Sequence, residues 1–454
     1  MIKFLPLGGA SEIGANCYYL QINNCGILLD CGMHPRKTGV ESLPRLSLIE
    51  NKPVDFLLIS HAHQDHLDSL PYFVNKFPYV KIITTPQTRA VAELTLHNSV
   101  SIMKENIADD NFRIYSHDEI DLLIRSIEYK ACGEVFEISA SGKKDNNIKV
   151  CFYDAGHIIG SAGILLQAAD FRIFYTGDIN LNDQSLLKGA SLPVEKINLL
   201  ILECTYGATD SSLLNSWNKE ELRLADSLNK IFNRGGSVLI PVFALGKMQE
   251  ILSVIHKLMS ENKIPDADIY TGGIADKISR IYDYNRFVVN MKNPGFELSS
   301  IKRKNYYEVK NYNEVFKSPS IVLASSGMML EKTASFRLAK RWLRENNSAI
   351  FTVGYMDEQT PGYKIAFARK GDKIRLTGSD EDITVRCEIK NFRFTAHSKR
   401  EELLEIVKRL SPEIVILVHG EEEAIDFIGN RILKQFKGTS VYKAETGNEI
   451  SIGI

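Results

Sequence analysis

Residues 61–66 read His-Ala-His-Gln-Asp-His, which puts four side chains of the metal-binding kind within six positions. Only ten His occur in the 454 residues, and three of them stand in this hexapeptide. Two His one residue apart can bind one cation, and the Asp-His pair behind them can bind a second. Imidazole and carboxylate ligands without thiolates are typical of zinc or manganese in catalytic sites. A polar loop that caps the following helix is the alternative interpretation.

Short apolar runs that predict buried strands precede this motif and several similar residues. The run 54–60 ends directly before the motif, and other runs end before His157, Asp178 and His419. The pattern of strand, turn and metal-type residue therefore recurs along the chain. Its polar members are Asp30, His61, His63, Asp65, His66, His157, Asp178, Glu203, His397 and His419.

Two cations held close together suit one class of reaction. At about 3.5–4 Å from each other they share one water, lower its pKa and stabilise the charge of an in-line displacement at phosphorus. The residue types therefore predict a hydrolase.

The chain changes character twice. From about Ser211, long helical runs such as 217–232 and 247–260 alternate with buried strands, which predicts a second, α/β domain. Near Arg386 short β-rich runs return and carry further metal-type residues. We therefore expect an insertion. The expected limits are residues 1–208 and 386–454 for the first domain and 209–385 for the inserted domain.

Composition narrows the class of protein. A hydrophobic share of 44% supports packed cores, and seven Cys without CxxC spacing argue against a disulfide framework and a zinc ribbon. We find no run of about 18 apolar residues and no signal peptide, so we expect no membrane contact and a cytoplasmic location. The net charge of -1 leaves only local basic clusters for a polyanion, at 302–304, 340–344 and 399–400. An ordinary solvated surface is the alternative for each cluster.

The motif at 61–66 resembles the HxHxDH signature of the metallo-β-lactamase superfamily. Asp30, His157 and Asp178 match the first, third and fourth motifs of that superfamily. Further stretches are similar to the β-CASP branch: 202–207 to its motif A, 394–398 to motif B, 418–420 to motif C, and 235–250 and 325–329 to its inserted domain. The resemblance implies an α/β protein with a four-layer αββα metallo-β-lactamase domain and an inserted α/β β-CASP domain.

The resemblance also implies roles for single residues. It implies two Zn2+ ions, with Mn2+ as the alternative, and a hydroxide between them as the nucleophile. The expected ligands are His61, His63 and His157 for one ion and Asp65, His66 and His419 for the other, with Asp178 bridging both and Asp30 orienting the imidazoles. The expected catalytic residues are Asp65, Glu203 and His397. His397 would protonate the leaving oxygen while Glu203 holds its ring, and a hydrogen-bonded pair without catalytic work is the alternative.

A His in motif C is typical of the RNA-directed members of the branch, among them ribonuclease J and the endonuclease of the polyadenylation machinery. His419 therefore favours a ribonuclease that hydrolyses phosphodiester bonds of single-stranded RNA, internally or from an end, in a cleft between the domains. The alternatives are a DNA nuclease, a small-molecule hydrolase such as a thioester hydrolase, and a non-catalytic scaffold of an RNA-processing complex. We expect the chain to lack the extra C-terminal domain of ribonuclease J, so that the cleft, a homodimer or a partner protein determines specificity.

Two features of the inserted part are expected to contact substrate phosphates. The turn Ser325-Ser326-Gly327 would do so through backbone N–H groups at the start of a helix, with a plain N-cap as the alternative. Lys247 stands where similar proteins carry Arg and would act as a point charge. The histidines that match no motif are expected on the surface or in the core, with His97 the exception if it borders the cleft. They are His34, His97, His117 and His256.

Overall fold

The computed structural model describes residues 2–106, 115–140 and 147–453, and the chain divides into two compact units. The chain leaves the first unit, builds the second and then returns to the first. The first unit consists of Met1–Asn182, Leu187–Leu213 and Ala396–Ile454, and the second consists of Asp183–Leu186 and Leu214–Thr395.

Two seven-stranded sheets form the first unit. The first sheet has the strand order β22-β1-β2-β3-β4-β5-β6, and β3 to β6 run parallel to one another. Its strands are β22 (Ile450–Ile452), β1 (Ile2–Gly8), β2 (Cys17–Ile22), β3 (Cys25–Leu29), β4 (Phe56–Leu58), β5 (Lys81–Thr84) and β6 (Glu128–Tyr129).

The second sheet has the strand order β21-β20-β11-β10-β9-β8-β7. Strands β10, β11, β20 and β21 run parallel, and β8 shares their direction because β9 pairs antiparallel with both β8 and β10. The carboxyl ends of these five strands therefore lie at one edge of the sheet. Its strands are β21 (Ser440–Lys443), β20 (Ile414–Val418), β11 (Leu199–Glu203), β10 (Phe171–Tyr175), β9 (Ala162–Ala168), β8 (Ile148–Asp154) and β7 (Val135–Ile138).

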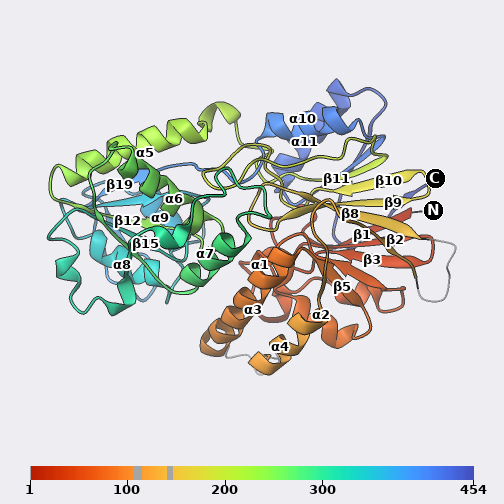
Figure 1. Cartoon of the computed structure of the whole chain (residues 1–454), viewed down its shortest axis with the longest axis horizontal. Helices are drawn as coiled ribbons and strands as arrows, with labels where there is room; N and C mark the ends of the chain where they lie inside the picture. Colours follow the sequence, from red (N-terminus) through yellow and green to blue (C-terminus); the bar gives the residue numbers. More distant parts are fainter. Residues whose placement is uncertain (1, 107–114, 141–146, 454) are drawn as a thin grey trace. The chain divides into compact units, whose positions relative to one another are not determined.

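The two sheets of the first unit pack face to face, with helices on the outside. Strand β11 shows the reason, because its apolar side chains alternate between two cores. Leu199 and Ile201 lie between the sheets, whereas Leu200 and Leu202 lie in the core that includes α10 (Arg400–Leu410) and α11 (Glu422–Gln435). On the side of the first sheet lie α1 (Gln64–Leu67), α2 (Leu70–Lys76), α3 (Pro86–Asn106) and α4 (His117–Ser126) (Figure 1). This order confirms the expected four-layer αββα domain.

The second unit is built on a six-stranded sheet in the order β14-β13-β15-β12-β16-β19, in which every pair is parallel. Trp342 has no exposed surface and lies in the core of this unit with Leu239 and Ile350. The helices are α5 (Trp217–Phe232), α6 (Lys247–Ser260), α7 (Ile274–Asn285), α8 (Ala334–Trp342) and α9 (Pro361–Phe367). The strands are β12 (Ser237–Pro241), β13 (Asp268–Thr271), β14 (Lys304–Asn305), β15 (Ser320–Ala324), β16 (Ala349–Thr352) and β19 (Glu388–Asn391), with β17 (Lys373–Ile374) and β18 (Ile383–Thr384) as a separate pair.

The elements can be compared with the expectations from the sequence. Helices α5 and α6 occur at the predicted residues, 217–232 and 247–260. The predicted return at residue 386 comes too early, because β19 pairs with β16 and so belongs to the sheet of the second unit. The predicted domain limits as a whole remain a proposal. Among the described residues no helix has the length and apolar character needed to cross a membrane.

The core between the sheets should be sensitive to the loss of single side chains. Ile416, on β20, has no exposed surface there. We expect Ile416→Ala to lower the free energy of unfolding of the first unit by about 2–5 kcal/mol, because the missing carbon atoms leave a cavity. Ile416→Val is the matched control and should cost about 0.5–1.5 kcal/mol. Native-state hydrogen exchange of the β20 amides measures both losses, and equal losses would contradict this account of the core.

Candidate metal centre

Side chains that can bind metal ions lie at the carboxyl ends of strands in both sheets of the first unit. In the first sheet, Asp30 follows β3 and the motif at 61–66 lies shortly after β4. In the second sheet, His157 lies beyond β8, Asp178 beyond β10, and His419 directly after β20. Strands that run in one direction end at the same edge of a sheet, so residues far apart in the sequence become neighbours.

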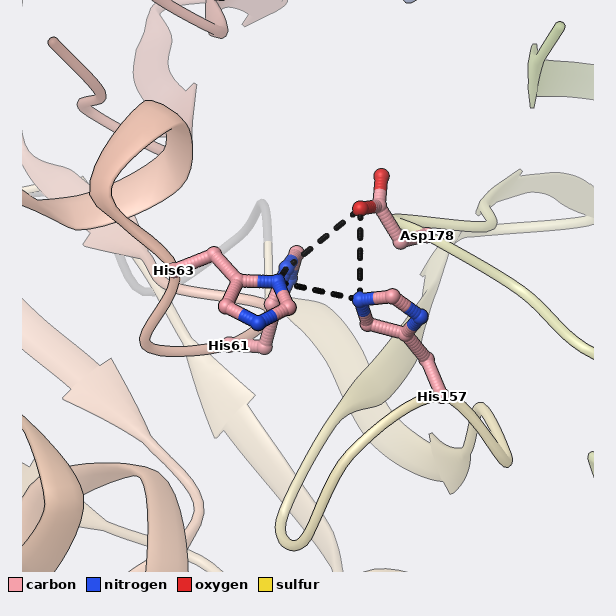
Figure 2. A group of neighbouring side chains, drawn as sticks. All are labelled: His61, His63, His157 and Asp178. Atoms are coloured by element: carbon pink, nitrogen blue, oxygen red, sulfur yellow. Dashed lines mark hydrogen bonds and ion pairs between the residues drawn. The ribbon is translucent and has the colours of Figure 1, made fainter. Parts of the chain in front are cut away.

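Four of these side chains point toward one another (Figure 2). Nε2 of His61 lies 3.1 Å from Nδ1 of His63, and Nε2 of His157 lies 3.0 Å from the same atom. Oδ2 of Asp178 lies 3.5 Å from Nε2 of both His61 and His157. Ligands about 2.0–2.1 Å from a zinc ion stand about 3.3 Å apart at the corners of a tetrahedron, so this group has the dimensions of a zinc site.

The three imidazoles of this group are kept in the neutral form, which is the form that binds a cation. Burial and then the proximity of His66 lower the pKa of His61. Burial and then His61 lower the pKa of His63 to about 3. Burial and then His397 hold the pKa of His157 well below its usual range. Neutral rings direct nitrogen lone pairs into the space that they share.

A second group consists of Asp65, His66 and His419. Oδ2 of Asp65 lies 3.8 Å from Nε2 of each imidazole. Oδ1 of Asp178 lies 3.2 Å from Nε2 of His66 and 3.3 Å from Nε2 of His419. Asp178 therefore faces the first group with one carboxylate oxygen and the second group with the other.

The surroundings of Asp178 test whether cations fit these two groups. Its Oδ1 atom is buried, and within the described residues no group donates a hydrogen bond to it. A buried carboxylate oxygen without a partner costs free energy. A divalent cation beside this oxygen would satisfy it together with the nitrogen lone pairs of His66 and His419. The oxygen and nitrogen donors thus fit the zinc or manganese ions implied by the sequence.

Asp30 orients two of the imidazoles. Its carboxylate accepts hydrogen bonds from the backbone N–H of Ser60 at 2.6 Å, and from the hydroxyl groups of Ser60 and Tyr175 and Nδ1 of His66 at 2.7 Å each. The hydroxyl oxygen of Ser60 in turn accepts from Nδ1 of His61 at 3.0 Å. Both rings therefore turn Nε2 toward the two groups, a geometry compatible with the orienting role predicted for Asp30.

Asn16 has a comparable position, and reasoning from the sequence missed it. Its side chain is fully buried, and Oδ1 accepts hydrogen bonds from the Tyr18 hydroxyl at 2.7 Å and from Nδ1 of His419 at 2.8 Å. Its amide nitrogen lies 2.9 Å from Nε2 of His66. Asparagine is uncharged and common in turns, so no local pattern distinguishes this residue. Only the fold brings it beside two imidazoles of the second group.

Two glycines allow the loops of the site to pack closely. A Cβ atom on Gly32 would lie 1.7 Å from the carbonyl oxygen of Asp65, and a Cβ atom on Gly420 would lie 2.7 Å from Cβ of Cys204. The loop after β3 thus lies directly against the helix that carries Asp65, and the loop after β20 lies against the end of β11. Larger residues at either position would displace the backbone that holds the ligands.

His397 and Glu203 form a third group with Asp178. Nδ1 of His397 donates to Oε1 of Glu203 at 3.0 Å, and Nε2 lies 3.9 Å from Oδ2 of Asp178. Glu203 accepts hydrogen bonds from the backbone N–H groups of Ile179 at 3.1 Å and Thr205 at 2.8 Å. Burial lowers the pKa of His397, but the charges of Glu203 and Asp178 outweigh burial, so that its pKa is raised. The ring therefore favours the imidazolium form, which can donate a proton.

Lys247, one of the predicted phosphate contacts, is engaged inside the second unit. Its Nζ atom donates to the carbonyl oxygen of Phe394 and lies 5.3 Å from the ring centroid of Trp217. Burial lowers the pKa of Lys247 to about 8. Its ammonium group thus already has partners, which is at odds with the predicted role in binding phosphate.

The turn Ser325-Ser326-Gly327 does not start a helix, contrary to the expectation. Helix α8 begins only at Ala334, and its N-cap is Thr333. The backbone between turn and helix cannot be helical, because Met329 and Lys332 adopt left-handed φ angles of 51° and 66°. The N-terminal end of a helix therefore does not act at this turn, and a phosphate contact there remains a proposal.

The basic clusters singled out in the sequence contain several ion pairs. Arg303 lies 2.9 Å from a carboxylate oxygen of Asp276, and Lys304 lies 2.7 Å from one of Asp268. Lys340 pairs with Asp380. These contacts favour the ordinary-surface interpretation for the clusters at 302–304 and 340–344.

The histidines outside the motifs lie apart from the three groups. His97 contacts both His117, at 2.8 Å between Nδ1 atoms, and Asp121, at 3.1 Å from Nε2. The ring of His256 stacks on Phe296 with centroids 5.4 Å apart, and His34 is buried. Their partners are those of surface and core histidines.

The position of Asn16 leads to a prediction about the second group. Asn16→Ala should lower the affinity of that group for a divalent cation about 10–100-fold, because the imidazole of His419 loses the acceptor that orients it. Metal emission spectroscopy after dialysis against graded chelator should then find one cation per chain where the parent keeps two. Asn75→Ala, on α2, is the matched control and should behave as the parent. Retention of both cations at parental affinity would contradict the role of Asn16.

Three family models match the chain. The model described as metallo-beta-lactamase superfamily matches residues 11–128, and the Beta-Casp domain matches residues 248–365. A model described as Zn-dependent metallo-hydrolase RNA specificity domain matches residues 382–444. The three matches fall in the first part of the first unit, within the inserted unit, and across the end of the inserted unit into the return.

Curated relatives match nearly the whole chain. It is 28% identical over 100% of its length to cleavage and polyadenylation specificity factor subunit 3 of Dictyostelium discoideum, and 30% identical over 96% to endoribonuclease YSH1 of Saccharomyces cerevisiae. It is 29% identical over 99% to the Integrator complex subunit 11 homolog of Dictyostelium discoideum. The chain spans 57%, 57% and 61% of the length of these three relatives.

A solved structure supports the fold independently. A protein of unknown function from Enterococcus faecalis superposes with a TM-score of 0.57 at 13% sequence identity, over 99% of both chains. At this identity the likeness concerns the fold alone. The motifs, the three family models and the fold together show that the chain belongs to the β-CASP branch of the metallo-β-lactamase superfamily.

Proposed function

We propose that this chain is a metal-dependent ribonuclease that hydrolyses phosphodiester bonds of single-stranded RNA. The observation that carries the proposal is the pair of metal-type groups that share Asp178. The RNA specificity domain model over residues 382–444 and the relatives named endoribonucleases support RNA as the substrate.

Two cations are part of this proposal. His61, His63 and His157 would hold one cation, and Asp65, His66 and His419 would hold the other, with Asp178 bridging both. Zinc is the proposed metal and manganese the alternative, because the donors are imidazoles and carboxylates without a thiolate. When bound, the two cations would lower the pKa of a shared water and offset the charge that develops at phosphorus.

Of the two carboxylate ligands, Asp65 has the more exposed side chain. Its side chain is 19% exposed, whereas that of Asp178 is 4% exposed. We assign to Asp65 the task of accepting a hydrogen bond from the attacking water and so orienting it toward phosphorus. Asp178 is enclosed and keeps the two ligand groups at a fixed separation.

His397 is the proposed acid for the leaving oxygen. Glu203 accepts a hydrogen bond from Nδ1 and is itself held by two backbone N–H groups, so the ring has one orientation. Nε2 is left on the side of Asp178, 3.9 Å from Oδ2, where it can pass a proton to the substrate. The carboxylate of Glu203 then stabilises the charged ring before transfer.

Other activities have less support. His419 in motif C favours RNA over DNA, and no ligand position in the two groups is lost, as it would be in a non-catalytic scaffold. A partner protein is part of the proposal, because relatives are named as subunits of a cleavage and polyadenylation factor and of the Integrator complex. The homodimer and the cytoplasmic location remain predictions.

Asp178→Ala tests the shared carboxylate. The variant should lose RNA cleavage to below detection and lose both cations, because each ligand group loses a carboxylate oxygen of Asp178. Metal content per chain and cleavage rate are measured on the same preparation. Asp170→Ala, at an exposed position of the first unit, is the matched control. Two cations per chain in the Asp178 variant would contradict the bridging assignment.

His397→Ala separates acid catalysis from metal binding. The variant should keep both cations and lower kcat about 10²–10⁴-fold, the usual contribution of a positioned acid. An RNA with sulfur in place of the bridging leaving oxygen needs no proton on departure, so the variant should cleave it nearly as fast as the parent does. Loss of a cation from the variant would instead make His397 a ligand. Glu203→Gln should give an intermediate loss, because it keeps an acceptor but removes the charge.

The reaction itself is tested with single-stranded RNA labelled at the 5′ end or at the 3′ end, beside DNA of the same sequence. Chain loaded with zinc or manganese should cleave the RNA and spare the DNA, and the fragments from each label distinguish internal from end-directed cleavage. Cleavage of DNA at an equal rate would favour the DNA nuclease. Absence of cleavage by a chain with two bound cations would contradict the proposed reaction for this chain alone.

A further inference from the structure

A basic pocket in the second unit has no role in the proposed reaction. It has a volume of about 300 Å³ and is lined by Arg234, Ala368, Arg369, Lys370, Glu388 and Ile389, all residues of that unit. These residues come from the turn after α5, the segment after α9 and the start of β19. Because the pocket combines three separate segments, no single run of charged residues in the sequence predicts it.

The pocket carries an excess of positive charge. Glu388 is its only carboxylate, and it pairs with Arg234 through Oε2 at 3.0 Å and with Lys390 through Oε1 at 3.1 Å. Throughout the part of the chain that the structure describes, the side chains of Arg369 and Lys370 have no hydrogen-bond or ion-pair partner. Two cations therefore remain for an anionic ligand, in contrast to the ion-paired Arg303, Lys304 and Lys340.

Hydrogen bonds fix the Arg234 guanidinium and the backbone that carries Arg369. The Arg234 guanidinium donates to two backbone carbonyl groups just before β16, one of them at 2.8 Å from Nε. The side chain of Asn391, at the end of β19, donates to the carbonyl of Ala366 at 2.8 Å, and the Asp372 carboxylate accepts the backbone N–H of Arg369 at 2.7 Å. These bonds hold the segment after α9 against β19. The backbone that carries Arg369 and Lys370 is therefore fixed, which lowers the cost of ordering these residues on a ligand.

Lys370 and Arg234 both act electrostatically on the buried thiol of Cys387. Burial raises the pKa of the Cys387 thiol to about 12, and the positive charges of these two residues act against that shift. Both cations therefore lie near the same thiol, which directly precedes Glu388 of the pocket.

Two aromatic residues lie on α9, directly before the pocket segment 368–370. Phe367 is 64% exposed and directly precedes Ala368, one of the lining residues. The ring of Tyr363 lies 4.3 Å from the ring of Phe367, at an interplanar angle of 38°. Phe367 is exposed and Tyr363 partly buried. Proteins stack the bases of single strands on exposed aromatic rings while nearby cations bind the phosphates.

We propose that this pocket and Phe367 form a second binding site for single-stranded RNA. Arg369 and Lys370 bind phosphates of the strand, and a base stacks on Phe367. The inference rests on the proposed function, since it takes RNA as the substrate, and it adds a contact made entirely by the second unit. An acidic segment of a partner protein would match the cations, but it would not use the exposed ring of Phe367.

Equilibrium binding of fluorescein-labelled oligouridylate to the whole chain in chelator, where no cleavage occurs, tests the proposal. The double variant Arg369→Glu/Lys370→Glu should bind about tenfold more weakly or worse and lower the slope of log K against log salt by about 1.4, because each lost phosphate contact removes about 0.7. Lys310→Glu/Lys317→Glu changes two exposed lysines of the same unit and is the matched control, with unchanged binding. Phe367→Ala should weaken binding of oligouridylate about fivefold or more while leaving an abasic strand unaffected.

The outcomes separate this site from the reaction. A parent chain that cleaves RNA, together with a double variant whose affinity and salt slope equal those of the parent, would overturn the second site and leave the ribonuclease standing. Loss of binding to poly-glutamate with intact RNA binding would assign the pocket to a protein partner and would equally overturn the proposal. A parent chain that neither binds nor cleaves RNA would overturn both.

Discussion

The buried carboxylate of Asp178 is the constraint on which the site depends. Its Oδ2 atom lies 3.5 Å from the imidazole nitrogens of His61 and His157, and its Oδ1 atom faces two further imidazole nitrogens. Among the described residues Oδ1 has no hydrogen-bond donor. A negative charge enclosed in this way is costly unless positive charge lies beside it. Two divalent cations, one on each side, would remove this cost and link both sheets of the first unit. Metal binding and stability of this region are therefore expected to be coupled.

The fold places the ligands through one repeated device. Strands that share a direction end at one edge of each sheet, and the two sheets pack face to face, so that β4, β8, β10 and β20 deliver their following loops to a common place. Local hydrogen bonds then turn each ring. Asp30 orients His66 directly and His61 through Ser60. The carbonyl oxygen of Ala396 accepts a hydrogen bond from Nδ1 of His157 at 2.7 Å. The ligand atoms are thus oriented by the protein before any metal binds.

The sequence was sufficient for the parts of this arrangement that have local patterns. The dense motif at 61–66, the apolar runs before His157 and His419, and the amphipathic helices α5 and α6 are each visible within one short window. Residues whose importance arises only from tertiary contacts were not visible. Asn16 is an uncharged residue that meets His419 across more than four hundred positions, and the basic pocket joins three distant segments.

Two expectations failed because local rules had competitors. The turn at Ser325 was expected to begin a helix, but the left-handed φ angles of Met329 and Lys332 delay the helix to Ala334. The return to the first unit was expected at residue 386, but the pairing of β19 with β16 keeps four more residues in the inserted sheet. Both failures concern the limits of elements, where backbone conformation and strand pairing outweigh composition.

The most direct measurement is X-ray diffraction at the zinc absorption edge from crystals of the chain grown with zinc. The account predicts two anomalous peaks about 3.5–4 Å apart, each within bonding distance of a different carboxylate oxygen of Asp178. One peak should lie on the histidines 61, 63 and 157, and the other on Asp65, His66 and His419. A single peak, or a peak held by Glu203 and His397, would contradict the shared-carboxylate site.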